Sequence, residues 1–263
     1  MSAASERAEK LISSWSVLYD ARREFLKKYR SVWDIPIRDK HTEVLLEELA
    51  PDTSVLEIGS SDRKLETLLV DSFDGLTFKS MDIDRETKHD YYSLDEIHEA
   101  FNAVLLFEVI EHMPFAGGVR VLARIFDLLA PGGKLIMTTP NVAHPTHYYR
   151  DPTHTTPYSH EGLGGILVGL GYESIKCCRI YNAPALPKAL HKYLLSPLHR
   201  FLDVDFAHTL MLVASRPQTS TPLRHCAFGC TRSSTHEYIH EDHPAAPHDR
   251  SRVQGVVSHR HLT

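Results

Sequence analysis

The sequence predicts an α/β fold in which helices flank a doubly wound, mostly parallel sheet, preceded by N-terminal helices. From residue 54 onward, short apolar runs alternate with helical stretches, and the most regular of these helices ends at a Pro-Gly-Gly turn. Strands that alternate with helices imply parallel βαβ units. The length of 263 residues suffices for one large α/β domain, or for a medium-sized domain with additions.

Residues 1–50 are expected to form an N-terminal helical cap. Apolar side chains recur at helical spacing from Leu11 to Tyr19 and again from Leu45 to Leu49, before Pro51 ends the segment. The α/β domain should occupy residues 51–216. Its expected strands are 55–58, 76–81, 103–107, 134–138, 174–180 and 209–214, with the clearest helix at 119–129 and a helical insertion at 189–201.

The last segment, 217–263, differs in composition from the rest of the chain. It holds seven of the 18 histidines, many Ser, Thr, Pro and Arg residues, and no sustained apolar period. We predict a disordered or weakly ordered tail. Cys226 and Cys230 have a spacing close to that of zinc ligands, but a second matching pair is missing, so we favour a tail without a metal site.

Composition and charge narrow the functional classes. Apolar residues make up 42% and charged residues 24%, which is typical of a soluble globular protein. A net charge of -5 argues against nucleic-acid binding through a global positive field. No apolar run approaches the ~18 residues of a membrane span, and no secretory signal is visible. Adjacent Cys177 and Cys178 make a poor disulfide framework, so we expect a cytoplasmic protein.

The ends of the first two expected strands have the features of a nucleoside site. In an open parallel sheet, ligands bind beyond the carboxyl ends of the strands. Gly59 follows the first strand and permits a tight turn with close approach of a ligand. Asp82 follows the second strand, where a carboxylate can accept two hydrogen bonds from ribose hydroxyls. The alternative is an ordinary strand-to-helix turn with a solvated aspartate.

Four segments, in this order, resemble the class I methyltransferases that use S-adenosylmethionine: VLEIGSSDRKL, MDID, FNAVLLFEVIEHM and LLAPGGKLIMTTPN. The resemblance covers about residues 40–216 and implies a Rossmann-like fold with a seven-stranded sheet. It implies that Glu57 and Gly59 lie near the methionine part of the cofactor, Asp82 near the ribose and Asp90 near the adenine. The full set of implied cofactor contacts is Glu57, Gly59, Ser60, Ser61, Asp82, Ile83, Asp90 and Phe107.

Three positions depart from the family pattern. The family has glycines in the form G-x-G-x-G, whereas this chain has Ser61 and Arg63 at the second and third positions, and Asn102 replaces the aspartate that usually begins the fourth strand. These departures favour, as an alternative, a relative that binds the nucleoside without catalysis. A nicotinamide-dependent Rossmann enzyme is disfavoured, because its fingerprint needs glycines at positions 61 and 64.

Glu108, Glu111 and His112 form a candidate metal site. If a helical turn begins at Glu108, the other two fall at i+3 and i+4 and all three share one face. Carboxylates suit Mg²⁺ or Mn²⁺, and an imidazole shifts the preference toward manganese, iron or zinc. The alternative is that the glutamates cap the following helix and His112 packs on it.

A histidine-rich loop after the fifth strand strengthens the metal hypothesis. Between Thr138 and Ser159 it carries His144, His147 and His154 among prolines and aromatic residues. The E-x-x-E-H run, the TTPN run and this loop together resemble small-RNA 3′-terminal 2′-O-methyltransferases. The E-x-x-E-H run is also found in ubiquinone-biosynthesis O-methyltransferases, and D-P-T-H is typical of bacterial sugar methyltransferases. The resemblance implies a metal held by Glu108, Glu111, His112 and His154.

These observations predict an enzyme that transfers a methyl group from S-adenosylmethionine to a hydroxyl of a small polyol or sugar-type acceptor. A divalent ion, Mg²⁺ or Mn²⁺, would bind the hydroxyl, and His112, His147 or His154 would accept its proton. The acidic net charge makes RNA the less favoured acceptor.

Overall fold

The structure is a computed structural model that describes residues 1–218. Nearly all of the predicted tail, including Cys226 and Cys230, lies outside the described residues.

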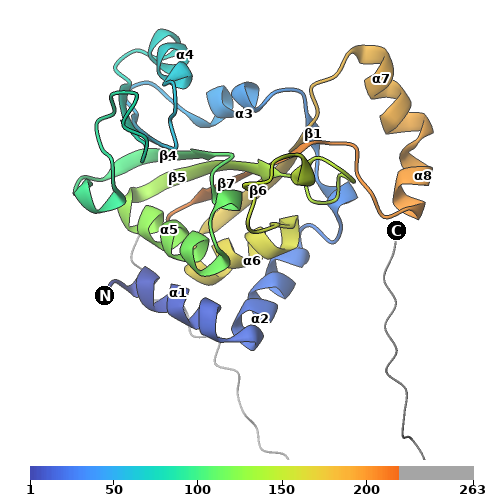
Figure 1. The fold of residues 1–263 in the computed structure, drawn as a ribbon, viewed down its shortest axis with the longest axis horizontal. Coiled ribbons are helices and arrows are strands. Elements are labelled where there is room, and N and C mark those ends of the chain that lie inside the picture. The colour runs from blue at the N-terminus through green and yellow to red at the C-terminus, as the bar shows by residue number, and fades with distance from the viewer. Residues whose placement is uncertain (219–263) are drawn as a thin grey trace, which may run out of the picture. The chain divides into compact units, whose positions relative to one another are not determined.

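Seven strands form one sheet with the order β1-β6-β7-β5-β4-β2-β3 (Figure 1). The strands are β1 (Ile37–Arg38), β2 (Ser54–Ile58), β3 (Thr77–Met81), β4 (Phe101–Phe107), β5 (Leu129–Pro140), β6 (Glu173–Ile180) and β7 (Thr209–Ser215). β2 pairs in parallel with β3 and β4, β4 with β5, and β1 with β6, whereas β7 runs antiparallel to β5 and β6. The predicted mostly parallel, doubly wound sheet is therefore confirmed.

Helices cover both faces of the sheet (Figure 1). One side carries α5 (Phe115–Leu128) and α6 (His160–Leu170), with α1 (Ala3–Ser13) and α2 (Trp15–Leu26) as a further layer outside them, and the other carries α3 (His41–Glu48) and α4 (Lys64–Ser72). Because side chains alternate along a strand, Leu56 belongs to the core beneath α5 and α6, and Val55 belongs to the core beneath α3 and α4.

Glycines allow α2 to pack closely against α6. A Cβ on Gly164 would lie 2.4 Å from the ring of Phe25, and one on Gly165 would lie 2.6 Å from Cγ of Arg22. Serine caps begin both N-terminal helices, since the hydroxyl of Ser2 accepts a hydrogen bond from the backbone of Ser5 and that of Ser14 from Val17. The close contact between α2 and α6 anchors the N-terminal segment to the α/β core.

The segment 1–50 is not helical throughout, which corrects the sequence prediction. After α2 come the 3₁₀ turn η1 (Val32–Asp34) and β1, which pairs with Arg179 and Ile180 of β6. A strand of two residues has no period that a sequence pattern can reveal.

Two connections also differ from expectation. The segment 130–133, predicted as a turn, already belongs to β5, with Gly132 at φ +77° and an irregular register against Phe101. The connection from β3 to β4 contains only the short turn η2 (Leu94–Glu96). It stays against the sheet because Tyr91 forms an isolated bridge with Met81.

The predicted helical insertion is present between β6 and β7. It consists of α7 (Ala185–Ala189), the π-helical turn η5 (Leu190–Leu194) and α8 (Ser196–Phe201). Two 3₁₀ turns, η3 (Ile110–His112) and η4 (Tyr148–Arg150), follow β4 and β5. Among the described residues, no helix combines the length and apolar character needed to cross a membrane.

Candidate active site

The loops after β2, β4 and β5 meet at one edge of the sheet. These three strands are parallel and adjacent, so their carboxyl ends lie side by side. The first loop contains Gly59, the second contains Glu108–His112 and the third is the histidine-rich loop. The topology thus brings together the segments that the sequence singled out.

Gly59 allows the loop after β2 to pack against the loop after β4. Its backbone N–H donates to the carbonyl of Met81 at 2.9 Å, and its φ of +77° lies in the left-handed region. A Cβ here would lie 2.3 Å from Cγ2 of Val109. Only glycine therefore allows the turn after β2 to rest directly on the turn after β4.

The two residues that stand at the second and third glycine positions of the family pattern also adopt left-handed backbone conformations. Ser61 has φ +44° and Arg63 has φ +56°. This conformation costs a residue with a Cβ atom about 1–2 kcal/mol relative to glycine. The Arg63 guanidinium donates to both oxygens of Glu66 and to the carbonyl of Lys88, and it lies 3.5 Å from the carboxylate of Asp90. Arg63 thus links α4 to the connection between β3 and β4.

Asp82 follows the last residue of β3, and hydrogen bonds from two backbone groups fix its carboxylate. One of its oxygens accepts from the backbone of Ser61 at 2.8 Å and the other from the backbone of Asp84 at 3.0 Å. Each carboxylate oxygen keeps a second lone pair for a ligand. Next to it, the side chain of Ile83 is 83% exposed, which leaves an apolar surface beside the carboxylate.

The remaining predicted cofactor residues occupy distinct environments. Glu57 is buried and accepts a hydrogen bond from the hydroxyl of Ser60 at 2.6 Å, and burial raises its pKa to about 7. Asp90 accepts from the backbone of Ser80 at 2.9 Å, so its carboxylate holds the connection to β3. The ring of Phe107 packs edge-on against His41 of α3 at 5.6 Å.

Asn102 lies at the opposite end of β4 from these loops. Its side-chain oxygen accepts from the backbone and the hydroxyl of Ser54 at 3.0 and 2.8 Å. It aligns the beginnings of β2 and β4, and this departure from the family pattern therefore lies outside the cofactor site.

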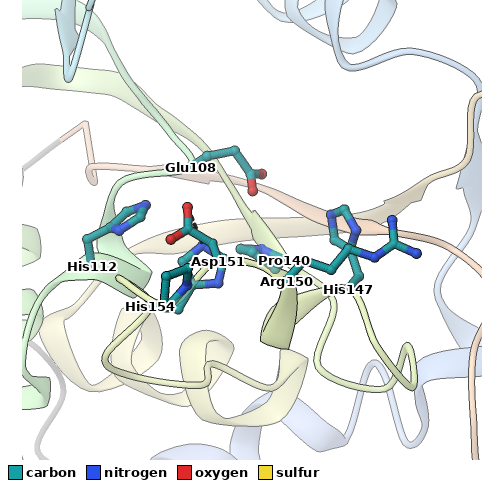
Figure 2. A pocket seen from close by; sticks show the side chains of 8 residues that line it. Glu108, His112, Pro140, His147, Arg150, Asp151 and His154 are labelled. Atoms are coloured by element: carbon teal, nitrogen blue, oxygen red, sulfur yellow. Dashed lines mark ion pairs between the residues drawn. The ribbon is translucent and has the colours of Figure 1, made fainter.

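Three of the four predicted metal ligands form a cluster. One ligand atom from each of Glu111, His112 and His154 lies within 4.8 Å of the other two. Within residues 1–218 these three form the only such group of metal-binding side chains. Glu108 lies outside this group, but it lines one pocket together with His112 and His154 (Figure 2).

The local backbone differs from the predicted helical turn. Glu108 has φ +53°, and the 3₁₀ turn η3 begins only at Ile110, so the i, i+3, i+4 face does not exist. In the described structure no side chain caps α5, whose N-cap residue is Pro114, so the glutamates do not act as helix caps either.

The hydrogen bonds of the two imidazoles define their free nitrogens. The hydroxyl of Thr153 donates to Asp151 at 2.6 Å, so it accepts from Nδ1 of His112 at 2.9 Å. Nδ1 of His154 donates to the carbonyl of Tyr148 at 2.7 Å. Both rings therefore keep the lone pair on Nε2, and an N–H donated to a carbonyl or hydroxyl is the usual arrangement behind a metal-bound histidine.

Glu111 is fully buried and only half satisfied. One oxygen accepts from the hydroxyl of Thr139 at 3.2 Å, whereas Oε1 has no partner among the described residues. Burial raises the pKa of Glu111, and burial together with the nearby Glu111 charge raises that of Glu108. A cation beside the unpaired oxygen would compensate this unfavourable burial.

A pocket of about 450 Å³ opens over this cluster, and Figure 2 shows its polar lining. His112 and His154 lie on one side and His147 and Arg150 on the other. Burial lowers the pKa of His147, whose ring lies 5.0 Å from that of His208 and whose Nδ1 has no partner in the described structure. His147 is thus a neutral imidazole apart from the cluster.

The sequence reasoning missed the residues that orient this site. Thr153 and Asp151 fix His112, and His208 packs on His147. His208 had one available signal: it directly precedes β7, whose antiparallel direction places its beginning at the carboxyl edge of β5.

Comparisons with known proteins identify the family and the fold. The model of the methyltransferase domain family matches residues 26–195. No curated protein sequence matches the chain significantly. A SAM-dependent methyltransferase from Archaeoglobus fulgidus is 16% identical with a TM-score of 0.54, and the alignment covers 66% of this chain and 90% of that one.

A second similar structure is the complex that contains the Haloferax volcanii Trm112 methyltransferase activator. The matching chain is 14% identical with a TM-score of 0.51, and the alignment covers 77% of this chain and 96% of that one. At such identities the likeness establishes a shared fold.

Proposed function

This chain belongs to the family of methyltransferase domains, and from that premise we propose that it transfers a methyl group from S-adenosylmethionine to a hydroxyl of a small polyol or sugar-type acceptor, with a divalent metal ion in the site. The observation that carries the choice of a hydroxyl and a metal is the cluster of Glu111, His112 and His154. It lies at the same sheet edge as the Gly59 loop, which is where donor and acceptor must meet.

The residues after β2 and β3 fit S-adenosylmethionine in their chemistry. Asp82 offers carboxylate oxygens for the ribose hydroxyls, and the exposed Ile83 offers apolar contact beside them. Glu57 lies buried at the end of β2, near the expected position of the methionine part. An ionised Glu57 would stabilise the positive charges of the cofactor there.

The chemistry of the donor set also fits a divalent ion. Glu111 would contribute its unpaired oxygen, and His112 and His154 their free Nε2 atoms. Glu108, whose carboxylate interacts with that of Glu111, would complete the set. When bound, such an ion lowers the pKa of a coordinated hydroxyl and orients a neighbouring one.

The chain's own residues would position the reactants and receive the proton. With His112 and His154 assigned to the ion, His147 is the remaining imidazole in the pocket, and its lowered pKa keeps it neutral and able to accept a proton. The polar lining suits an acceptor rich in hydroxyl groups. The principal contribution of the fold is to hold donor and acceptor in line at near-contact distance.

The test separates cofactor binding, metal binding and turnover. We expect the wild type to bind S-adenosylhomocysteine and Mn²⁺ in calorimetry, and to label a member of a panel of nucleotide sugars and polysaccharide fragments only when Mn²⁺ or Mg²⁺ is present. Glu111→Gln should lose Mn²⁺ binding and keep S-adenosylhomocysteine binding, whereas the exposed control Glu43→Gln should lose neither. Full turnover after exhaustive chelation would exclude the metal role.

A further inference from the structure

The helical insertion between β6 and β7 exposes an unusual number of large apolar side chains. Tyr193 is 73% exposed, Leu194 69% and Phe201 84%, although all three lie on helical segments. We call the exposed side chains of this insertion the apolar face; its members are Leu186, Leu190, Tyr193, Leu194, Leu198, Phe201 and Leu202. Single exposed leucines are normal, but a contiguous set of this kind indicates a binding surface.

The apolar face follows a regular helical repeat. From Leu186 to Leu202 its members are separated by steps of four, three and one residues, and that series occurs twice. Such steps place side chains on one side of a helix. Leu195 connects η5 directly to α8; it has φ -89° and ψ -10° and donates its N–H to the carbonyl of Leu190. Exposed apolar side chains therefore recur at helical spacing along all three segments of the insertion.

The charged side chains on the helical segments of the insertion are basic, although the exposed Asp203 follows directly after Leu202. Between positions 184 and 202 the sequence has Lys188, Lys192 and Arg200 and no aspartate or glutamate, although the chain as a whole has a net charge of -5. Lys188 pairs with Asp39. Lys192 and Arg200 are exposed, and neither forms an ion pair with another described residue. The Lys192 ammonium lies 5.2 Å from the ring centroid of Tyr193, so this cation adjoins the apolar face.

The inner side of the insertion is anchored beside the candidate active site. The rings of His191 and His199 lie 5.1 and 5.4 Å from that of Phe206, which contacts Tyr181 at 4.8 Å. Two residues further on, His208 packs against His147 of the pocket. Figure 1 shows α7 and α8 beside the sheet, away from the helices that cover its faces.

We propose that the apolar face, with Lys192 and Arg200, docks the protein on an anionic lipid surface. Leucines and aromatic side chains would enter the boundary between headgroups and acyl chains while the basic groups contact lipid phosphates. A second copy of the chain is the less suitable occupant, because a two-fold contact would bring the same basic residues together. Docking of this kind is independent of the metal and of the acceptor.

The test is flotation of the full chain with vesicles. We expect binding to phosphatidylglycerol–phosphatidylcholine vesicles and little binding to phosphatidylcholine alone, with weakening at about 0.5 M NaCl. Leu194→Ser combined with Phe201→Ser should reduce binding by about tenfold or more. Lys192→Gln and Arg200→Gln should each reduce it by about fivefold, since one basic residue near such a surface contributes about that factor.

Trp15→Ser is the matched control, because Trp15 is 70% exposed on α2, in another part of the fold. It should bind as the wild type does, and circular dichroism should show that every variant is folded. Equal binding to both vesicle types, or wild-type binding by the Leu194/Phe201 double variant, would overturn the proposal. So would a dimer in light scattering that this double variant dissociates, because the face would then belong to a second copy.

Discussion

Replacing Gly59 with alanine should destabilise the protein and disturb both halves of the site. The new Cβ would lie 2.3 Å from Cγ2 of Val109, and the backbone would retain a φ of +77°. Left-handed backbone costs an alanine about 1–2 kcal/mol. Forcing an extra carbon into a packed contact costs about 1–3 kcal/mol more. We therefore expect the free energy of unfolding to fall by about 2–5 kcal/mol.

A double-mutant cycle separates these two contributions. Val109→Ala removes the methyl group that the new Cβ would meet, so the double variant should regain the packing part and keep the backbone part. Gly117→Ala is the matched control, because the nearest neighbour of its Cβ would be Cδ of Pro114 at 3.9 Å. Alanine in that helical position should leave stability unchanged or raise it by up to about 1 kcal/mol.

The assay is urea denaturation followed by far-UV circular dichroism, together with calorimetry of S-adenosylhomocysteine binding at a temperature where each variant is folded. Gly59→Ala should bind the nucleoside more weakly than the wild type, because its loop must shift away from Val109. Stability within 0.5 kcal/mol of the wild type, a threshold typical of neutral surface changes, would refute the steric reasoning. So would a coupling energy of zero between positions 59 and 109.

Three further predictions concern single side chains. Asp82→Ala should weaken S-adenosylhomocysteine binding by about 1.5–3 kcal/mol per lost hydrogen bond, and unchanged affinity in calorimetry would reject the ribose assignment. Burial raises the pKa of Glu57 from 4.5 to about 7. The folded protein therefore binds this proton more tightly than the unfolded chain does, and the resulting stabilisation is complete below about pH 4.5. The free energy of unfolding should fall by about 3 kcal/mol as the pH rises from 4.5 through 7. Glu57→Gln should flatten the measured pH profile in that interval, and an unchanged slope would contradict the shift. Asp205→Ala should cost about 3–5 kcal/mol in urea denaturation because it leaves Arg179, 2.8 Å away, buried without its partner; a loss below 1 kcal/mol would be incompatible with that pair.

The sequence predicted the sheet well because each long strand is a buried apolar run between polar turns. β2 and β4 illustrate this, since their interior residues Val55, Leu56, Leu105 and Leu106 are fully buried. β1 could not be found, because two residues show no alternation and their pairing with β6 depends on a partner more than 140 positions away. The connection from β3 to β4 was equally invisible, since the hydrogen bonds of Asp90 to β3, rather than a periodic pattern, hold it in place.

The ligand cluster was predicted for a partly incorrect reason. The expected helical face from Glu108 does not form, yet Glu111, His112 and His154 converge. Convergence follows from the topology, because β4 and β5 are parallel neighbours and their carboxyl ends must adjoin. The backbone of a short loop depends on individual hydrogen bonds, and no period in the sequence encodes them.

The turn after β4 is the element through which the two halves of the site are coupled. Val109 supports Gly59 of the loop after β2, and the carbonyl of Glu111 accepts the N–H groups of Thr155 and Thr156 at 2.7 and 3.0 Å. His112 adds its hydrogen bond to Thr153 in the same loop. Neighbouring residues of one turn thus contact two segments: the loop after β2, which is expected to bind the methyl donor, and the loop after β5, which carries His154. Because methyl transfer depends on the alignment of donor and acceptor, a rigid turn shared by both segments meets that need more directly than two independent loops would.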